Sequence, residues 1–464
     1  MERIKKFFQT TASKNGTYSI GITFVILVMV VVANLIIGQL PEKVRKIDVS
    51  SNRLYEISDT TKKLMKKLDQ DVDVKVLADK ENTDERIKTF LSKYTGLSDH
   101  ISVEWIDPVL HPATLNEYNA SENTIVVSCA DTGKSTTISF DDILVTDMSS
   151  YYYTGTVTES EFDGDGQLTS ALSYVTTEST WKIYRTSGHG ESTFSATISE
   201  LIDKANYTVE ELNLVMEPTI PEDCDLLMMY APTNDLSEAE AKAVTDYMTT
   251  GGKVMVIWGD KGKGELPNLE NILKTYGLEI ADGYIADMQR NYQGNYWYIF
   301  PELSLNESLS DGISSQMVLT VNSRGMEQVD PARDTITVTP FMTTSSDGYA
   351  VTEETEKQGT FLLGATATET QDDTESRLTV IAGTSLIDAQ ITDSFPTLEN
   401  TKLFMNAVTA NFDGVENVSI EPKSLTVERN TVQHGGVFSI LLIFILPLAI
   451  LIGGFIVWFR RRRA

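Results

Sequence analysis

One stretch decides the fold class of this chain, and it reads Thr180-Trp181-Lys182-Ile183-Tyr184-Arg185-Thr186-Ser187-Gly188-His189-Gly190-Glu191. The segment Trp181–Arg185 has the apolar and aromatic character of a short buried strand. Gly188 and Gly190 favour a tight turn, and a helical pattern follows at Thr193–Asn206. A strand, a glycine-rich turn and a helix form the opening unit of an open α/β domain, in which ligands bind at the carboxyl ends of the strands.

Strands and helices continue to alternate along residues 179–414. Further strands are predicted at Val209–Leu214, Asp225–Tyr230 and Lys253–Trp258, and helices at Ser237–Thr249, Leu269–Tyr276 and Leu398–Phe412. This alternation predicts a doubly wound α/β domain with a mainly parallel sheet. Residues 281–360 are rich in aromatic side chains and interrupt the pattern as an insertion or lid, after which Phe361–Ala365 and Leu378–Ala382 return to the sheet.

A second, smaller α/β domain is predicted at residues 70–150. A strand at Val72–Leu77, a helix at Thr83–Leu97 and a strand at Ile101–Ile106 are followed by a hairpin. Residues 41–69 form a membrane-proximal segment and helix before this domain, and residues 151–178 form a loop and helix after it. Residues 415–436 are predicted to be an extended membrane-proximal segment.

Both ends of the chain carry an uncharged apolar run, and each is long enough to cross a bilayer as a helix. The predicted transmembrane helices are residues 18–40 and 437–459. Basic residues in the N-terminal segment 1–17 and in the Arg-rich tail 460–464 place both termini in the cytoplasm by the positive-inside bias. The ectodomain then lies on the outer face of the cell membrane. The alternative for the first run is a cleaved signal peptide, although no small-residue cleavage site follows it.

The charge of the chain excludes one class of partner. The formal net charge is -28, although both termini are basic, so the acidic surplus lies in the ectodomain. Such a surface does not attract nucleic acid or anionic lipid through bulk charge. The two cysteines, Cys129 and Cys224, could form one disulfide, but the apolar residues after Cys224 favour a buried thiol. No C-x-x-C pair is present to support a redox or structural zinc site.

Two short motifs resemble ligand sites without fitting them. Gly133-Lys134-Ser135-Thr136 matches the end of a phosphate-binding loop, but position 128 is Ser and a strand follows, so a hairpin turn is favoured. The sequence Asp163-Gly164-Asp165-Gly166 suggests a calcium loop, but the next ligand positions fail. We therefore expect a solvated turn ahead of a helix at Gln167–Thr177.

The candidate site residues are Gly188, His189, Gly190 and Glu191. His189 and Glu191 could serve as base and acid, because residues two apart in a turn can face one ligand. No G-x-S-x-G elbow accompanies them. The alternative is that the glycines permit a tight turn, while the two polar side chains cap the following helix or bind a ligand without reacting. No catalytic, metal or cofactor residue is assigned.

A family resemblance rests on the order of several segments along the chain. They are Asp48-Val49-Ser50, Leu54-Tyr55-Glu56-Ile57-Ser58, Ile106-Asp107-Pro108, Gln167-Leu168-Thr169-Ser170-Ala171-Leu172, Gly188-His189-Gly190-Glu191, Pro221-Glu222-Asp223-Cys224-Asp225, Leu236-Ser237-Glu238-Ala239-Glu240 and Gly251-Gly252-Lys253-Val254. Together with the terminal span and its arginines, they resemble the GldG-like auxiliary proteins of ABC-2-type transport systems, which were first associated with gliding motility.

This resemblance implies a non-catalytic subunit that works beside an ABC permease and a cytoplasmic ABC ATPase. It also implies a small thioredoxin-like domain without redox cysteines, followed by a flavodoxin/amidotransferase-like domain without its nucleophile. We therefore expect an ectodomain that binds a substrate, an envelope component or a partner, with homo-oligomerisation left open. Two alternatives remain, a cell-surface hydrolase that uses His189 and Glu191 and a purely structural spacer.

Overall fold

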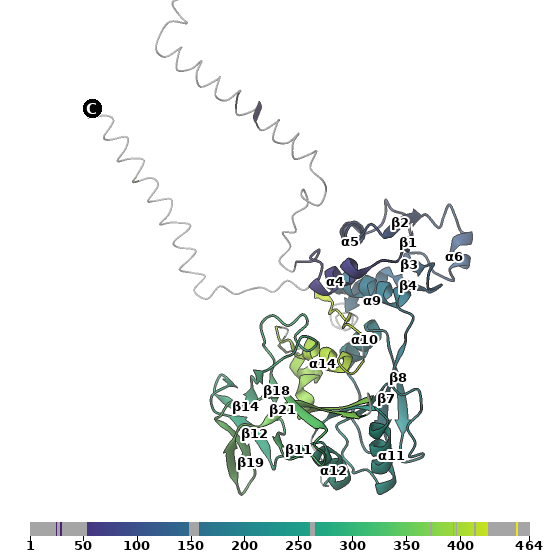
Figure 1. The fold of residues 1–464 in the computed structure, drawn as a ribbon. Helices are drawn as coiled ribbons and strands as arrows, with labels where there is room; N and C mark the ends of the chain where they lie inside the picture. The colour runs from purple at the N-terminus through teal and green to yellow at the C-terminus, as the bar shows by residue number, and fades with distance from the viewer. Residues whose placement is uncertain are drawn as a thin grey trace, which may run out of the picture.

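The computed structural model describes residues 53–147, 157–259, 265–371, 374–392, 394–395, 397–412 and 414–425, and the isolated positions 25, 28, 29 and 452. The predicted membrane helices and both cytoplasmic ends lie outside the described residues, except at those four positions. In the part that is described, no helix has the length and apolar character needed to cross a membrane. The described residues form a mixed α/β structure with several sheets (Figure 1).

The N-terminal body is built on a four-stranded sheet with the order β2-β1-β3-β4. Its elements are β1 (Val72–Leu77), α5 (Glu85–Thr95), β2 (Ile101–Ile106), α6 (Ala113–Glu117), β3 (Thr124–Cys129), β4 (Ser135–Ser139) and α7 (Phe140–Ile143). The β1 strand pairs parallel with β2 and antiparallel with β3. The β3–β4 turn contains Gly133 at a φ of 69°, so the residues that resemble a phosphate-binding loop form the predicted hairpin.

Helix α5 shows how the sequence builds this body. The Asp84 carboxylate accepts a hydrogen bond from the Arg86 backbone N–H and caps the first turn. Ile87, Phe90, Leu91 and Tyr94 follow helical spacing and are all buried against the sheet. The sequence pattern therefore determines both where this helix begins and which face packs.

The Asp163-Gly164-Asp165-Gly166 segment is not a solvated turn, because it forms the buried start of helix α9 (Gly164–Thr176). The Asp165 carboxylate accepts hydrogen bonds from the Ser58 N–H and the Thr61 hydroxyl, each at 2.7 Å. Ser58 is in turn the N-cap of α4 (Asp59–Lys67). A side chain at Gly164 would meet the rings of Phe90 and Phe162. The small and acidic residues at the start of α9 therefore permit close packing against α4 and against the rings of Phe90 and Phe162.

Segments from the two ends of the described chain lie together. A small sheet with the order β23-β6-β5 combines β5 (Leu144–Asp147), β6 (Thr158–Phe162) and β23 (Lys423–Ser424). The Lys423 ammonium group donates to the backbone carbonyl oxygens of Leu54 and Glu56. The first and last segments of the described body are therefore joined directly.

The C-terminal body is organised around a ten-stranded sheet, counted over the described residues. Its main order is β11-β17-β21-β22-β10-β9-β7-β8, and β15 and β18 extend it beside β21. The strands are β7 (Trp181–Ser187), β8 (Tyr207–Asn213), β9 (Leu226–Tyr230), β10 (Lys253–Ile257), β11 (Leu278–Ile280), β15 (Glu302–Leu303), β17 (Met326–Gln328), β18 (Ile336–Thr343), β21 (Leu362–Gln371) and β22 (Thr374–Ile381). From β8 to β22 neighbouring strands are parallel. The pairs beyond β22 are antiparallel, so the sheet is mixed rather than mainly parallel. The difference arises because the β21–β22 hairpin reverses the chain and the insertion supplies β17 and β18.

Helices cover both faces of the parallel half (Figure 1). They are α10 (Ala196–Lys204) and α14 (Asn400–Thr409) on one face, and α11 (Glu238–Thr249) and α12 (Pro267–Thr275) on the other. In β9, Leu226, Met228 and Tyr230 face the first layer, whereas Leu227 and Met229 face the second. Strands buried on both faces are apolar at every position, which explains the continuous Leu-Leu-Met-Met run. Both cysteines are buried and free, as the sequence favoured for Cys224.

The insertion forms small sheets at one end of the main sheet (Figure 1). Its further strands are β12 (Tyr284–Asp287), β13 (Asn291–Tyr292), β14 (Asn295–Ile299), β16 (Thr320–Val321), β19 (Gly348–Val351) and β20 (Glu356–Gly359). Asp287 is fully buried and accepts hydrogen bonds from the N–H groups of Gln289, Arg290 and Ser345. The described part after β22 adds the short helices η1 (Thr384–Leu386) and α13 (Ala389–Thr392).

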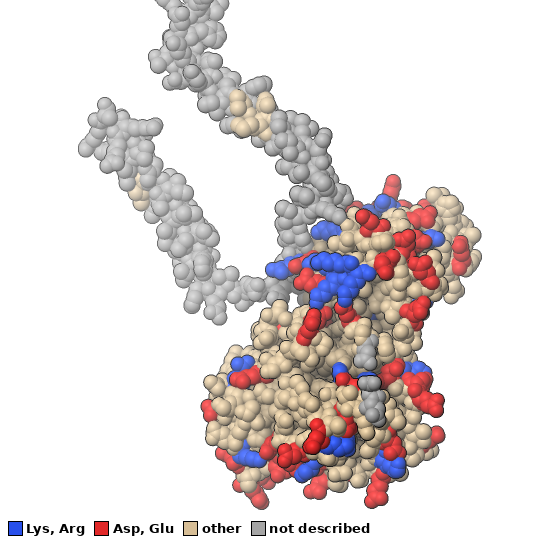
Figure 2. Space-filling view, viewed as in Figure 1, with Lys and Arg blue, Asp and Glu red and all other residues tan. Residues whose placement is uncertain are grey.

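Buried and surface ion pairs join the two bodies. Lys204 on α10 is buried, and its Nζ lies 2.7 Å from Oδ2 of Asp163, the residue that precedes α9. On the surface, Lys63 and Lys67 of α4 pair with Asp311 and Glu416. Figure 2 shows Lys and Arg side chains gathered over the region of α4, while acidic side chains are spread over the rest of the visible face.

Candidate functional site

The predicted site residues lie at the carboxyl end of β7. Gly188 and Gly190 have φ values of 106° and 75°, a backbone region that residues with a side chain rarely occupy. A Cβ atom at Gly188 would lie 2.7 Å from Cγ2 of Val215, and one at Gly190 would lie 2.2 Å from Oγ1 of Thr233. Both glycines are therefore required by the turn itself and by the loops packed around it.

The two polar residues of the turn face each other inside the protein. His189 has a side chain that is only 4% exposed, and its Nδ1 lies 3.4 Å from Oε1 of Glu191. Its Nε2 lies 3.2 Å from Oε1 of Glu240, whose side chain is 5% exposed. Glu240 also closes a capping box with Ser237 at the start of α11. The structure thus places His189 beside Glu191 instead of directing both side chains at a shared ligand, and it adds Glu240, which sequence reasoning did not select.

This arrangement favours the charged imidazolium. Contact with Glu191 raises the pKa of His189, with the charge of Glu240 adding to the effect, while burial opposes it. Burial alone would raise the pKa of Glu191, but bonding to His189 lowers it below its usual value. Both ring nitrogens face carboxylates, and a protonated imidazole cannot act as a general base. The geometry therefore gives no support to the hydrolase alternative at this residue.

The His189 turn also fills the crevice where this type of sheet usually holds a ligand. The chain runs from β7 to one neighbour, β8, and then returns to β9 on the other side, so the strand order reverses between β7 and β9. The His189 carbonyl oxygen accepts hydrogen bonds from the N–H groups of Thr233 and Asn234, each at 2.9 Å. These two residues belong to the loop after β9, so protein atoms occupy the strand-order switch.

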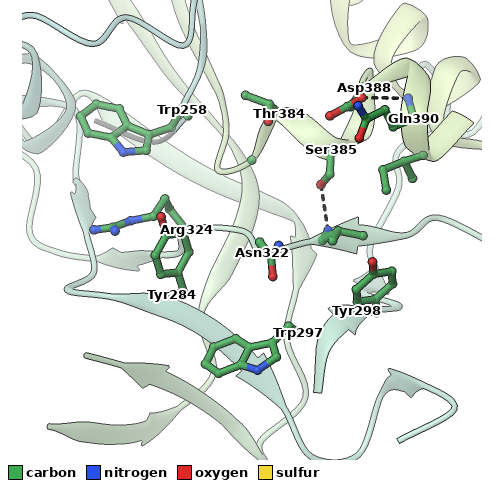
Figure 3. A pocket seen from close by; sticks show the side chains of 14 residues that line it. Trp258, Tyr284, Trp297, Tyr298, Asn322, Arg324, Thr384, Ser385, Asp388 and Gln390 are labelled. Atoms are coloured by element: carbon green, nitrogen blue, oxygen red, sulfur yellow. Dashed lines mark hydrogen bonds between the residues drawn. The ribbon is translucent and has the colours of Figure 1, made fainter. Parts of the chain in front are cut away.

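An open cavity lies further along the same edge, at the carboxyl ends of β10 and β22 (Figure 3). Its volume is about 630 Å³. Trp258 follows β10, and Thr384 and Ser385 follow β22 in η1. The insertion closes the other side with Tyr284 and Trp297. The insertion thus contributes a wall of the cavity.

One hydrogen bond joins the insertion to the segment after β22 at this cavity, and two more fix the wall within the insertion. The Ser385 hydroxyl accepts from the Val321 N–H at 2.8 Å, as the dashed line in Figure 3 shows. The Asn322 N–H donates to the Trp297 carbonyl at 3.0 Å, and the Ile285 N–H donates to the Ser323 carbonyl at 2.9 Å. The wall segment is therefore fixed from both sides.

Most residues of this cavity were not selected from the sequence. The aromatic cluster of the insertion was visible there, and Trp297 belongs to it. Arg324 and Asp388 carried no signal, because they lie in irregular segments that only the folded sheet brings together. No group of three or more His, Cys, Asp or Glu residues suited to a metal ion is found among the described residues.

Comparison with protein families identifies the larger body. Residues 180–383 match the family model described as an ABC-type uncharacterized transport system. This part of the chain is therefore similar to that ABC transport auxiliary family. The match confirms the family resemblance found in the sequence. Both the His189 turn and most of the cavity lie within the ABC transport auxiliary domain, and residues 51–146 match a domain of unknown function (DUF7088).

Structural comparisons add little to this assignment. The N-terminal domain of mmIFT52 is 16% identical over 50% of this chain and 98% of its own length, with a TM-score of 0.37. A ThuA-like protein from Bacteroides uniformis is 12% identical over 52% of this chain and 95% of its own, with a TM-score of 0.30. PurLQS from Thermotoga maritima is 8% identical over 50% and 98%, with a TM-score of 0.27. TM-scores below 0.5 do not establish that these proteins share the fold of the ABC transport auxiliary domain. No curated protein matches the sequence significantly.

Proposed function

We propose that this chain is a membrane-anchored, non-catalytic accessory subunit of an ABC-type transport system, with a folded body on the outer face that binds a ligand. The observation that carries the proposal is the family match over residues 180–383. The chain has no complete phosphate-binding loop of its own, so a partner must supply ATP hydrolysis. The proposed partners are an ABC permease and a cytoplasmic ABC ATPase.

Two membrane helices, residues 18–40 and 437–459, anchor the protein in this proposal, with both termini in the cytoplasm. Both segments are uncharged and long enough to cross a bilayer, and basic residues flank them, which supports this topology. The contact between Lys423 and Leu54 supports it as well, because it brings the two membrane-proximal segments together. A body tied at both ends in this way is held close to its permease.

The outer body would hold its ligand at the carboxyl edge of the parallel strands. The cavity between the sheet and the insertion supports this role, because its volume of about 630 Å³ suits a small molecule. In the proposal, Gly188, His189, Gly190 and Glu191 stabilise the same edge, and the cavity binds the ligand. A purely structural spacer would not require such a cavity. We further propose a thioredoxin-like N-terminal domain and a flavodoxin/amidotransferase-like C-terminal domain.

Copurification tests the proposal. Affinity-tagged full-length protein would be isolated in mild detergent and its companions quantified by mass spectrometry. An unrelated two-span membrane protein with the same tag would serve as the control. We expect a multi-span permease and an ABC ATPase in near-stoichiometric amounts. Recovery of the chain without either protein, under conditions that keep it folded, would contradict the proposal.

A further inference from the structure

The cavity in Figure 3 contains a buried cation that has no ionic partner among the residues that the structure describes. Arg324 is 9% exposed and lines the cavity. Among the described residues it forms no hydrogen bond or ion pair, and its Nε atom is buried without an acceptor. Its guanidinium carbon lies 5.1 Å from the centroid of the Tyr284 ring. Arginine remains charged at any physiological pH, so burial cannot be relieved by loss of a proton.

Other buried charges in the described part of this chain are paired with an opposite charge or accept hydrogen bonds. Lys204 contacts two carboxylates, and His189 lies between two more. The buried Glu399 carboxylate accepts hydrogen bonds from the N–H and hydroxyl groups of Ser314 and Ser315. Buried ionised groups normally need such compensation. Arg324 differs from them because it lines a cavity and has no carboxylate partner among the described residues.

A second donor without an acceptor lines the same cavity. Trp258 is 1% exposed, and its Nε1 atom has no hydrogen-bond partner among the described residues. Indole and guanidinium groups can only donate hydrogen bonds. Two buried donors in one cavity therefore call for a group rich in acceptor atoms and, next to Arg324, for a negative charge.

The cavity has a defined polarity. In Figure 3 Arg324 lies at the Trp258 end, while Asp388 and Gln390 lie at the opposite end. The Asp388 carboxylate accepts a hydrogen bond from the Gln390 N–H at 2.8 Å, and it would repel an anion placed beside it. The rings of Tyr284 and Trp297 also line the cavity and provide flat apolar surface.

We propose that this cavity binds a small organic acid, with its carboxylate or phosphate at Arg324 and Trp258 and its flat apolar part against Tyr284 and Trp297. This deepens the proposed ligand-binding role and rests on it. Arg324 would supply a charge-assisted hydrogen bond, and Trp258 would supply a second donor. Asp388 fixes the orientation, because it keeps the acidic group at the other end.

Three matched probes test the proposal: 1-naphthoate, 1-naphthyl phosphate and neutral 1-naphthamide. Binding to the full-length protein in detergent would be measured by ligand-observed NMR. We expect at least one of the two anions to bind at least about tenfold more tightly than the amide, the difference typical of a charge-assisted hydrogen bond. A preference between the two anions identifies carboxylate or phosphate as the recognised group.

Variants of Arg324 and Asp388 test whether the anion binds at the Arg324 end of the cavity. Arg324→Gln should reduce anion affinity by about tenfold or more and leave amide affinity unchanged, whereas Asp388→Asn should leave anion affinity unchanged or raise it. Arg324→Lys retains the charge and guards against a folding defect in the Gln variant, and it should bind the anion with intermediate affinity. Equal binding of all three probes, no anion binding, or unchanged anion binding by Arg324→Gln would overturn the proposal. Copurification with a permease and an ATPase in any of those cases would leave the accessory role intact, so the two failures are distinguishable.

Discussion

Nε2 of His189 lies 3.2 Å from Oε1 of Glu240, although the two residues come from the turn after β7 and the first turn of α11. Glu191 contacts the other ring nitrogen, so one buried imidazolium joins two carboxylates. A structural role in this buried cluster accounts for each residue of the Gly-His-Gly-Glu motif. Its glycines form the turn, its histidine ties that turn to α11, and its glutamate completes the charge balance.

Removal of the imidazole should destabilise the protein strongly. His189→Ala leaves two buried carboxylates facing each other without a cation, and breaking a buried pair in this way costs about 3 kcal/mol. Urea unfolding of the full-length protein followed by tryptophan fluorescence measures the loss. His100→Ala is the matched control, because the His100 side chain is 45% exposed and pairs with Asp71 at the surface. That control should stay within about 0.5 kcal/mol of the wild type.

The same cluster predicts a pH dependence with a definite sign. Because the pKa of His189 is raised in the folded state, its stabilising contribution is fully present below the ordinary histidine value of about 6.5. This contribution is lost as the pH rises through the folded value. The pKa values of Glu191 and Glu240 are lowered, so their contribution is present above about 4.3 and is lost as the pH falls. Unfolding curves of His189→Gln should lose the decline on the alkaline side, and an unchanged decline would rule out His189 as its source.

Substitution of Gly190 in the turn should destabilise the protein more than substitution of a glycine in open space. Gly190→Ala combines an unfavourable φ with a contact to Thr233, whereas Gly133→Ala has a φ of 69° and no atom within 4 Å of the new Cβ. The control should lose about 1 kcal/mol from backbone strain alone. Gly190→Ala should lose clearly more in the same unfolding assay. Equal losses would show that the Thr233 loop moves away without cost.

The buried Asp163–Lys204 ion pair should stabilise the contact between the N-terminal and C-terminal bodies. Burial raises the pKa of Asp163 to about 6, although Lys204 opposes the shift. Lys204→Met leaves a buried carboxylate without its cation and should cost about 3 kcal/mol at pH 7.5. The double variant Asp163→Asn/Lys204→Met should recover part of that loss, since the two residues form one interaction. If the double variant loses as much free energy of unfolding as the two single variants together, the two side chains do not stabilise each other.

Local sequence signals were sufficient for the regular elements. Ser237 and Glu240 form the capping box that begins α11, and the apolar run in β9 reflects burial on both faces. The sequence did not show that Asp163 and Asp165 would be buried, because their partners, Lys204 and Ser58, lie far away along the chain. The mixed sheet was missed because β17 and β18 come from an insertion without regular periodicity.

The candidate site was predicted only in part. The glycine spacing was enough to predict the turn that carries His189 and Glu191, but not the contact between their side chains. The ligand cavity depends on contacts between segments more than 60 residues apart, such as the Val321 N–H and the Ser385 hydroxyl. Nothing local to Arg324 distinguishes it from a surface arginine. Its significance comes from burial without a counter-charge, which only the fold reveals.

Placement of the folded body outside the membrane is the claim on which the transport role depends, and paired cysteine labelling tests it most directly. Cys129 and Cys224 are free thiols and would first be replaced by Ala. One cysteine would then be introduced at Met216, which is 82% exposed, or at Arg461 in the tail. On intact cells, an impermeant maleimide should label Met216→Cys at once and Arg461→Cys only after permeabilisation. Labelling of Arg461→Cys on intact cells, or protection of Met216→Cys, would contradict the account.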